Sequence, residues 1–427
     1  MNKIWCVIVL CGFQLLYAGD NALSVPQASD SVHEIGEYLY RQADAFAQSP
    51  QGFVARHTHL FELPSAKQQA VSHCILQRAQ ALLVTKPART LVSKSGVISA
   101  ATYDRHGTIV FSDGKSNAVT PWNPPNNPLE VKEILPDEED QKAEYIYAIA
   151  CNPKQDQSAL LGSLEHLYIQ NELGRIVYKE KHKTLWFSDV MAYNPEGNNL
   201  AVVTPAGMYI YDVSSSDNIT KKVAISFDTL CFNKSSLSAA YNSAGTVIAH
   251  PRDALVYFYT GQGGLIGKVD DGNAYKTSIA YKPGGKQIAF GSQSGAITIL
   301  EQKDKQGSPE GDATDLTWTP GLTIEAHNGW IRALAFSPDG TELLSAGDDN
   351  TVKAWNVVTG SLLRTFKDHL QEVIAIKYNK EGTQFFSASF DGMIRVYDRT
   401  PYQQALRDMK NIRQTLCMLS QKKQALQ

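Results

Sequence analysis

Serine, histidine and aspartate recur at matching intervals in two neighbouring stretches of the sequence. The first stretch contains His327, Ser345 and Asp349. The second stretch has the same spacing, with His369, Ser387 and Asp391. These residue types form the triad of many hydrolases, in which histidine takes the serine proton and aspartate orients the histidine. One enzyme needs only one such triad. The duplication therefore favours a structural role, in which buried polar groups satisfy one another's hydrogen bonds.

Other groups of reactive or ligand-type residues do not complete a known site. The glycine-rich segment 261–268 lacks the serine or threonine of a P-loop, because Val269 follows its lysine. His57 and His59 have no nearby cysteine or carboxylate pair that would complete a metal site. The four consecutive acidic residues 137–140 have the spacing of a solvated loop rather than a calcium site. We therefore predict no catalytic residue, no metal site and no cofactor.

A turn signal recurs along the chain and divides it into repeated units. Each turn places a glycine shortly after a short apolar run that is typical of a β-strand. The turn glycines are Gly107, Gly197, Gly245, Gly285, Gly340 and Gly382. A degenerate copy, Cys151-Asn152-Pro153, lies in the long gap after the first of these glycines. Residues 88–398 thus contain seven units of about 44 residues each.

The last two units also repeat the types of their side chains. Histidine stands thirteen residues before the turn glycine, serine five residues after it and aspartate nine residues after it. Trp355 and Tyr397 stand fifteen residues after it. Together with Ser337-Pro338-Asp339-Gly340 in the turn, these residues resemble the WD40 repeat. Some positions depart from that pattern: Ala326 and Asp368 replace the glycine before histidine, Asn356 replaces the final aspartate, and Tyr397 stands in the place of tryptophan.

The resemblance to the WD40 family implies an all-β fold, a seven-bladed β-propeller with one four-stranded sheet per repeat. It also implies a hydrogen-bonded network inside each of the last two blades. Its members are His327, Ser345, Asp349 and Trp355 in one blade, and His369, Ser387, Asp391 and Tyr397 in the other. Residues 88–93 resemble the run that precedes the seventh unit, and the seventh unit lacks an outer strand of its own. We therefore expect residues 88–93 to complete the last blade and close the ring.

The composition excludes several classes of protein. The 427 residues are 43% hydrophobic and carry a net charge of −3, from 40 basic and 43 acidic residues. This composition is that of a globular chain and gives no strong field that would recruit nucleic acid or a membrane surface. Six cysteines in a chain of this length do not make a disulfide scaffold.

The N-terminal residues 1–19 have the pattern of a signal peptide. Lys3 precedes an apolar run over residues 4–17, and the small residues Ala18 and Gly19 follow it. The run is shorter than the roughly 20 residues of a membrane span, so we expect cleavage and no stable membrane span afterwards. The protein is then secreted, periplasmic or lumenal; an uncleaved N-terminal anchor is the alternative.

Two extensions flank the predicted propeller, which covers residues 87–400. Residues 20–86 have the apolar spacing of helices, and residues 401–427 have that of an amphipathic helix with a cationic face. The second helix either docks on the rest of the chain or forms a coiled coil with a partner. The mature chain keeps four cysteines: Cys74, Cys151, Cys231 and Cys417. A bridge between Cys74 and Cys417, on the two extensions, and free thiols both remain open.

The histidines and aspartates that recur in the last two units also predict a binding face. In a four-stranded antiparallel blade, the turn between the second and third strands lies on the same side as the link into the next blade. The aspartates stand in these turns and the histidines in these links. The residues that flank them on this side are Trp330, Asp348, Glu372 and Phe390. Exposed aromatic side chains are typical anchors of protein interfaces. We therefore predict a non-catalytic protein-interaction scaffold. The alternatives are a small-molecule or glycan-binding propeller and a propeller hydrolase or lyase.

Overall fold

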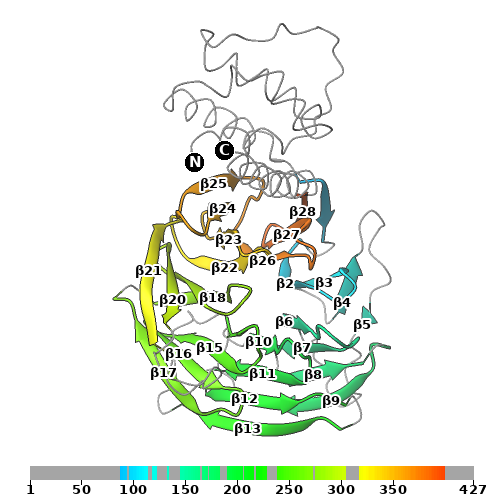
Figure 1. Cartoon of the computed structure of the whole chain (residues 1–427). Coiled ribbons are helices and arrows are strands. Elements are labelled where there is room, and N and C mark those ends of the chain that lie inside the picture. The colour runs from blue at the N-terminus through cyan, green and yellow to red at the C-terminus, as the bar shows by residue number, and fades with distance from the viewer. Residues whose placement is uncertain are drawn as a thin grey trace, which may run out of the picture. The chain divides into compact units, whose positions relative to one another are not determined.

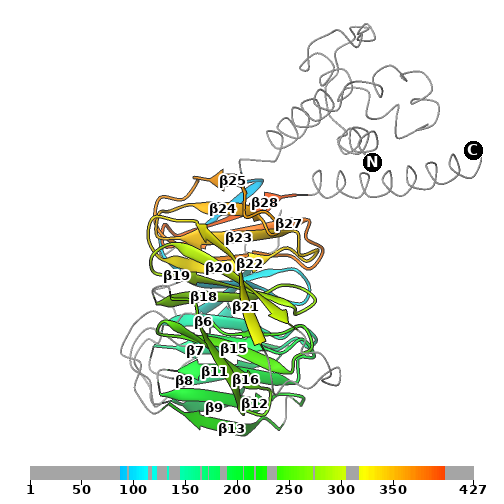
Figure 2. The ribbon, with the colours of Figure 1, turned by 60° about the vertical axis from the view of Figure 1, so that its left-hand side comes forward.

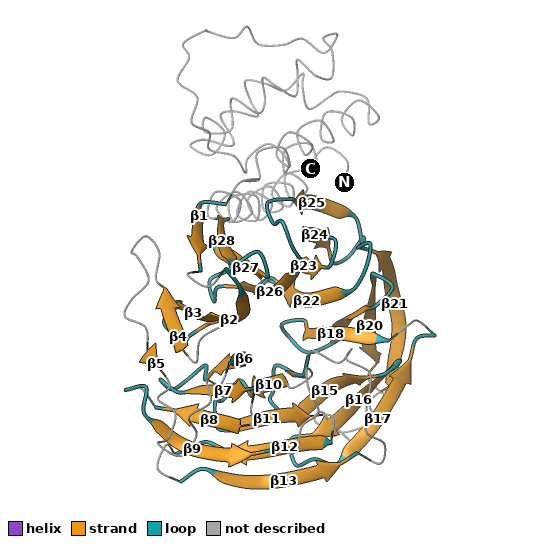
Figure 3. Ribbon diagram, turned by 180° about the vertical axis from the view of Figure 1, so that it is seen from behind, coloured by secondary structure: helices purple, strands orange, loops and turns teal. Residues whose placement is uncertain are grey.

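The computed structural model of the chain describes residues 87–399, except for 94–95, 114–117, 123–131, 134–144, 164–165, 172, 183–189, 205, 216–217, 228–237, 273–274 and 304–316. The described residues form strands and loops and contain no α-helix (Figure 3). The predicted signal peptide (1–19) and the predicted helical extensions (20–86 and 401–427) lie outside the described residues.

The described strands form seven four-stranded antiparallel sheets, which surround a central axis (Figure 1). We number the sheets as blades 1–7 in chain order. Blades 1–3 contain β2 (Ile98–Tyr103), β3 (Ile109–Asp113), β4 (Ala118–Trp122) and β5 (Lys132–Glu133); β6 (Ile146–Cys151), β7 (Ser158–Gly162), β8 (His166–Gln170) and β9 (Ile176–Lys181); and β10 (Val190–Tyr193), β11 (Asn199–Thr204), β12 (Gly207–Asp212) and β13 (Thr220–Ser226). Blades 4 and 5 contain β14 (Ala240–Tyr241), β15 (Val247–Arg252), β16 (Leu255–Thr260) and β17 (Leu265–Asp270), and β18 (Lys276–Tyr281), β19 (Gln287–Ser292), β20 (Ala296–Lys303) and β21 (Thr317–Glu325). Blades 6 and 7 contain β22 (Ile331–Phe336), β23 (Glu342–Gly347), β24 (Val352–Asn356) and β25 (Leu362–Phe366), and β26 (Val373–Tyr378), β27 (Gln384–Ser389), β28 (Met393–Asp398) and β1 (Arg89–Val92). The seven-bladed β-propeller predicted from the sequence is confirmed.

Six of the blades consist of four strands in sequence order, with the first strand innermost. The innermost strands of neighbouring blades contact one another around the axis, as β2 does with β6 and β22 does with β26 (Figure 1). Figure 2 shows the blades from the side. Blade 7 differs, because its fourth strand comes from the beginning of the ring. Strand β1 pairs with β28, with Arg89 opposite Val396 and Val92 opposite Met393. This pairing confirms the predicted ring closure by residues 88–93.

The hydrophobic core is divided into clusters between successive blades. Between blades 7 and 1, Leu91 and Ile394 of blade 7 pack with Phe111 of blade 1, and each is no more than 5% exposed. Equivalent clusters lie at the other six boundaries between blades. A single blade is apolar on both faces and must bury both against neighbours, so the closed ring supplies the stability that one blade lacks.

The predicted turns connect the first and second strands of their blades. Gly245 and Gly340 have φ angles of +68° and +67°, a conformation in which a side chain would be strained. Each of these two amides donates to the carbonyl oxygen three residues earlier, over 2.9 Å and 2.8 Å. The glycine-rich segment 261–268 contains the turn between β16 and β17 and the beginning of β17. It therefore lies within blade 4 and forms a hairpin.

Candidate functional site

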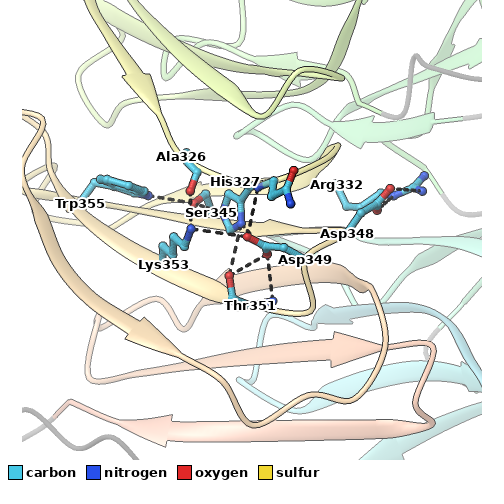
Figure 4. Close-up of polar contacts among 10 residues, drawn as sticks. Ala326, His327, Arg332, Ser345, Asp348, Asp349, Thr351, Lys353 and Trp355 are labelled. Atoms are coloured by element: carbon cyan, nitrogen blue, oxygen red, sulfur yellow. Dashed lines mark hydrogen bonds and ion pairs between the residues drawn. The ribbon is translucent and has the colours of Figure 1, made fainter.

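Blade 6 contains a continuous chain of buried polar side chains (Figure 4). The Trp355 indole N–H donates to Ser345 Oγ over 2.9 Å, and Ser345 Oγ lies 2.6 Å from His327 Nε2. On the other side of the imidazole, His327 Nδ1 lies 2.8 Å from Asp349 Oδ1. An indole N–H only donates and a carboxylate only accepts, so the hydrogen bonds run in one direction, from tryptophan through serine and histidine to aspartate.

This arrangement has the residue types of a hydrolytic triad but not the accessibility. Ser345 is 0% exposed, and its oxygen is already occupied by the Trp355 donor. Burial acts to raise the pKa of Asp349, but the hydrogen bonds from His327 and Thr351 outweigh it and hold the pKa well below its usual range. The carboxylate is thus a permanent acceptor. The geometry supports a structural network that joins the link before blade 6 to two of its strands.

Blade 7 has a variant of the same network. His369 lies 2.7 Å from Ser387 Oγ and 2.9 Å from Asp391 Oδ2. Tyr397, which occupies the position of tryptophan, donates its hydroxyl to Asp368 over 2.9 Å. The sequence correctly places a donor on Tyr397, but it does not identify Asp368, the residue before the histidine, as the acceptor.

A related cluster, which the repeat offsets did not reveal, joins blades 2 and 3. Tyr211 donates to Glu180 over 2.8 Å and its hydroxyl lies 3.0 Å from His182 Nε2. Glu180 also accepts a hydrogen bond from Tyr178 over 2.7 Å and forms an ion pair with Lys221. His182 stands fifteen residues before its turn glycine instead of thirteen, so a fixed offset misses it. An acidic residue close before a histidine, followed by tyrosine in the tryptophan position, would have been the signal.

The predicted binding residues lie on one face of the ring, which we call the link face. It consists of the links between blades and the turns between the second and third strands. The Asp348 amide donates to the Trp330 carbonyl over 3.0 Å, and the Phe390 amide donates to the Glu372 carbonyl over 3.1 Å. The same contact occurs in blades 2 and 5. It joins Ser163 to Tyr145 over 2.8 Å and Gln293 to Tyr275 over 2.9 Å.

Trp330 and Asp348 are held in place by a residue that the sequence reasoning missed. The Arg332 guanidinium lies over the Trp330 ring, 4.8 Å from its centroid. The same guanidinium donates to both carboxylate oxygens of Asp348, over 2.5 Å and 3.0 Å. All three side chains are partly exposed. Arg332 follows Trp330 by two residues, and this same-face spacing on a strand was the available signal.

Glu372 and Phe390 form the equivalent pair in blade 7. Phe390 is 38% exposed, and Glu372 is partly exposed. Between the two pairs, the Asn350 amide side chain donates to the Leu370 carbonyl over 3.2 Å. The structure therefore brings the four predicted residues together as two pairs on adjacent blades, and the hydrogen bond from Asn350 to Leu370 joins the loops beside them.

Within the part of the chain that the structure describes, no group of three or more histidine, cysteine or acidic residues has a geometry suited to a metal ion. Over the same residues, no helix is long and apolar enough to cross a bilayer. Cys151 is a free thiol. Cys74, Cys231 and Cys417 lie outside the described residues, as do His57, His59 and the acidic run 137–140, so the question of a Cys74–Cys417 bridge stays a prediction.

Comparison with known proteins finds two copies of a known repeat in the C-terminal part of the ring. A family model described as "WD domain, G-beta repeat" matches residues 318–356 and 360–398. Each match begins in the outer strand of one blade and continues through three strands of the next, so the repeat is offset from the blade by one strand.

Two curated relatives illustrate the extent of the similarity. Over 159 residues, the chain is 31% identical to the "Periodic tryptophan protein 2 homolog" of Dictyostelium discoideum, covering 35% of this chain and 16% of that protein. Over 128 residues, it is 32% identical to "Striatin" of Rattus norvegicus, covering 27% of this chain and 16% of that protein. The matched segments thus span about a sixth of the length of these relatives.

A solved structure extends the comparison to the whole ring. A chain in "Crystal Structure of Mitotic Checkpoint Complex" superposes with a TM-score of 0.60 at 15% identity, covering 74% of this chain and 92% of that one. At this level of identity the similarity concerns the fold alone. The chain thus has the fold of a seven-bladed β-propeller, and the family model finds WD40 repeats at residues 318–356 and 360–398 of it.

Proposed function

We propose that this propeller is a non-catalytic protein-interaction scaffold and that its partner binds the link face. The observation that carries the proposal is the position of the exposed aromatic residues. Among the described residues, the aromatic side chains with large exposed fractions are Tyr145 (45%), Tyr275 (39%) and Phe390 (38%). All three lie on the link face, in links or in a turn between second and third strands. Exposed aromatic rings are typical anchors of protein interfaces.

The cluster of Trp330, Arg332 and Asp348 adds a second kind of contact. Tryptophan and arginine are enriched among the residues that dominate binding energy. Here the arginine is already ordered by its ring contact and its two hydrogen bonds, so binding would cost little side-chain entropy. A partner that offers both an apolar group and a carboxylate would engage the ring of Trp330 and compete for Arg332.

A scaffold role also agrees with the burial of the serine–histidine–aspartate networks, which leaves their nucleophile without access to substrate. For location, we propose a secreted, periplasmic or lumenal protein. This proposal rests on the N-terminal sequence alone, with Lys3 before the apolar run 4–17.

The test is a double substitution on the link face, Trp330→Ala with Phe390→Ala. We expect capture of the native partner to be lost while the melting temperature stays within about 2 °C of the wild type, because both side chains are partly exposed. A matched control removes exposed apolar residues from the opposite face, Leu173→Ala with Val358→Ala, which are 64% and 84% exposed. Capture that survives the first pair, or is lost equally with the second, would contradict the proposal. Capture of a glycan or small ligand instead of a protein would favour the alternative class.

A further inference from the structure

The innermost strands carry an unequal set of charges. Within their described bounds, the first strands of the seven blades contain three cationic residues and no acidic residue. The cations are Lys276, Arg332 and Lys377. These strands line the central channel of a propeller. A positive charge in such an enclosed place needs a negative partner or exposure to solvent.

Two of the three cations have a carboxylate partner. Lys276 forms an ion pair with Asp271, and the two side chains are 1% and 4% exposed. Arg332 pairs with Asp348 through two hydrogen bonds, as described above. Both pairs lie toward the link face, because these cations stand at the beginning of their strands.

Lys377 lies at the other end of the channel, in the second-last position of β26. Its ammonium group donates to Thr102 Oγ1 of blade 1 over 2.8 Å. No described carboxylate lies within ion-pair distance of it. In the adjoining turn, Asp104 Oδ1 accepts the amides of His106 and Thr108, over 2.9 Å and 2.8 Å. Glu381, in the turn after β26, forms no described ion pair with Lys377 either.

Cys151 does not supply the missing negative charge. Its thiol is near enough to interact electrostatically with Lys377, but burial raises the pKa of the Cys151 thiol to about 12. The thiol is therefore protonated and neutral at physiological pH. Lys377 thus has a hydroxyl as its hydrogen-bond partner and a neutral thiol in its vicinity.

The other innermost strands carry small residues at the position of Lys377. The equivalent second-last positions of the other inner strands hold small residues: Thr102, Ala150, Ala192, Ala240, Ala280 and Ala335. The Lys377 side chain is exposed to solvent, yet desolvation by the surrounding protein lowers its pKa. A side chain that is both accessible and desolvated lies in a narrow space enclosed by protein, which describes the channel.

We propose that the end of the channel opposite the link face binds a carboxylate group, with Lys377 as its charge partner and the Thr102 hydroxyl beside it. One uncompensated ammonium group matches the single charge of a carboxylate, and the small residues around it admit a slender group. The carboxylate belongs either to a free small acid or to an acidic side chain of a peptide. This site is on the face away from the proposed protein-binding surface, so the two proposals fail or succeed separately.

The experiment measures protection of Lys377 in the full chain. Reductive methylation is followed by mass spectrometry, with the exposed Lys380 as an internal reference. The probes are N-acetylglycine and a capped Gly-Gly-Glu-Gly-Gly peptide. Their neutral counterparts are N-acetylglycinamide and the same peptide with glutamine. We expect a carboxylate probe at twice its dissociation constant to slow methylation of Lys377 about threefold relative to Lys380. The probe that protects better identifies the source of the carboxylate.

Two variants provide the second readout. The increase in melting temperature caused by the carboxylate probe should disappear in Lys377→Met, which keeps the length of the side chain, and should persist in Lys377→Arg, which keeps its charge. Equal protection by the neutral counterparts, protection by neither carboxylate probe, or a probe-induced shift that persists in Lys377→Met would each overturn the proposal. The methylation assay uses the wild-type protein and so decides the question even if a variant fails to fold.

Discussion

The hydroxyl of Tyr397 donates to Asp368 Oδ2 over 2.9 Å, and both residues depart from the WD40 pattern. Aspartate replaces the glycine before His369, and tyrosine replaces the tryptophan at the end of the repeat. In blade 6, where tryptophan is present, the indole N–H donates to Ser345, and alanine precedes the histidine. The two departures in blade 7 therefore compensate each other. Burial and the nearby carboxylate raise the pKa of Tyr397 well above its ordinary value, so its hydroxyl stays a donor.

The first prediction concerns this pair. Tyr397→Phe should reduce the free energy of unfolding by about 1–3 kcal/mol, because the Asp368 carboxylate loses its donor. Asp368→Ala should then cost less in the Tyr397→Phe background than in the wild type, with a coupling energy of about 1 kcal/mol. Urea unfolding of the four proteins in this double-mutant cycle measures the coupling. Additive effects would show that the two residues do not interact.

The second prediction tests ring closure with two neighbouring residues of one strand. Leu91 is 5% exposed between blades 7 and 1, whereas Val92 on the same strand is 64% exposed. Leu91→Ala should cost about 2–3 kcal/mol of unfolding free energy, and Val92→Ala less than about 0.5 kcal/mol. Chemical unfolding of the full chain compares the two. Similar small losses in both would mean that β1 does not contribute to the core of the ring.

The third prediction uses tyrosines in equivalent positions at the ends of innermost strands. The Tyr378 hydroxyl donates to Glu342 over 2.7 Å, but the buried Tyr193 hydroxyl has no described hydrogen-bond partner. Tyr378→Phe should therefore lower the unfolding free energy by about 1–2 kcal/mol, while Tyr193→Phe should leave it unchanged or raise it slightly. Thermal unfolding of the two variants gives the comparison. The same loss in both variants would show that Tyr193 is equally well satisfied.

The fourth prediction concerns acid sensitivity. Burial lowers the pKa of His250 from 6.5 to about 4, against the opposing effect of its hydrogen bond to the Ser238 carbonyl. The unfolded chain therefore binds this proton more readily, and stability is lost as the pH falls from about 6.5 to about 4. His250→Gln should make this decline shallower by up to about 1.4 kcal/mol per pH unit.

Urea unfolding at several pH values between 7 and 4 measures the slope. The control is Val358→Ala, which shortens an apolar side chain that is 84% exposed and removes no titratable group. It should keep the slope of the wild type. If His250→Gln also keeps that slope, proton uptake by His250 does not destabilise the ring.

The architecture could be predicted from the sequence because its signals are local and repeated. Each turn needs a residue that tolerates positive φ, and so the glycines recur at positions such as Gly245 and Gly340. Ring closure could also be predicted, because residues 88–93 resemble the outer strand before the last unit. The polar groups in blades 6 and 7 could be predicted because they recur at the same offsets from the turn glycine in both repeats.

The contacts that escaped sequence reasoning depend on three-dimensional neighbours without a fixed offset. The acceptor of Tyr397 is 29 residues away in sequence, and the acceptor of Tyr211 is 31 residues away. Lys377 donates to Thr102, which is 275 residues away in sequence. Periodicity identifies the face of a strand but not which side chain faces it across a blade boundary.

The pairing of β1 with β28 has a consequence for biosynthesis. About 300 residues separate the two strands, so at 5–20 residues per second the ribosome needs about 15–60 s to make β28 after β1. During this interval β1 has no partner in the ring, and blade 1 has no blade 7 to cover its face. The last boundary between blades therefore forms only when the C-terminal blade has emerged, and exposed apolar surface and strand edges must be protected from aggregation until then.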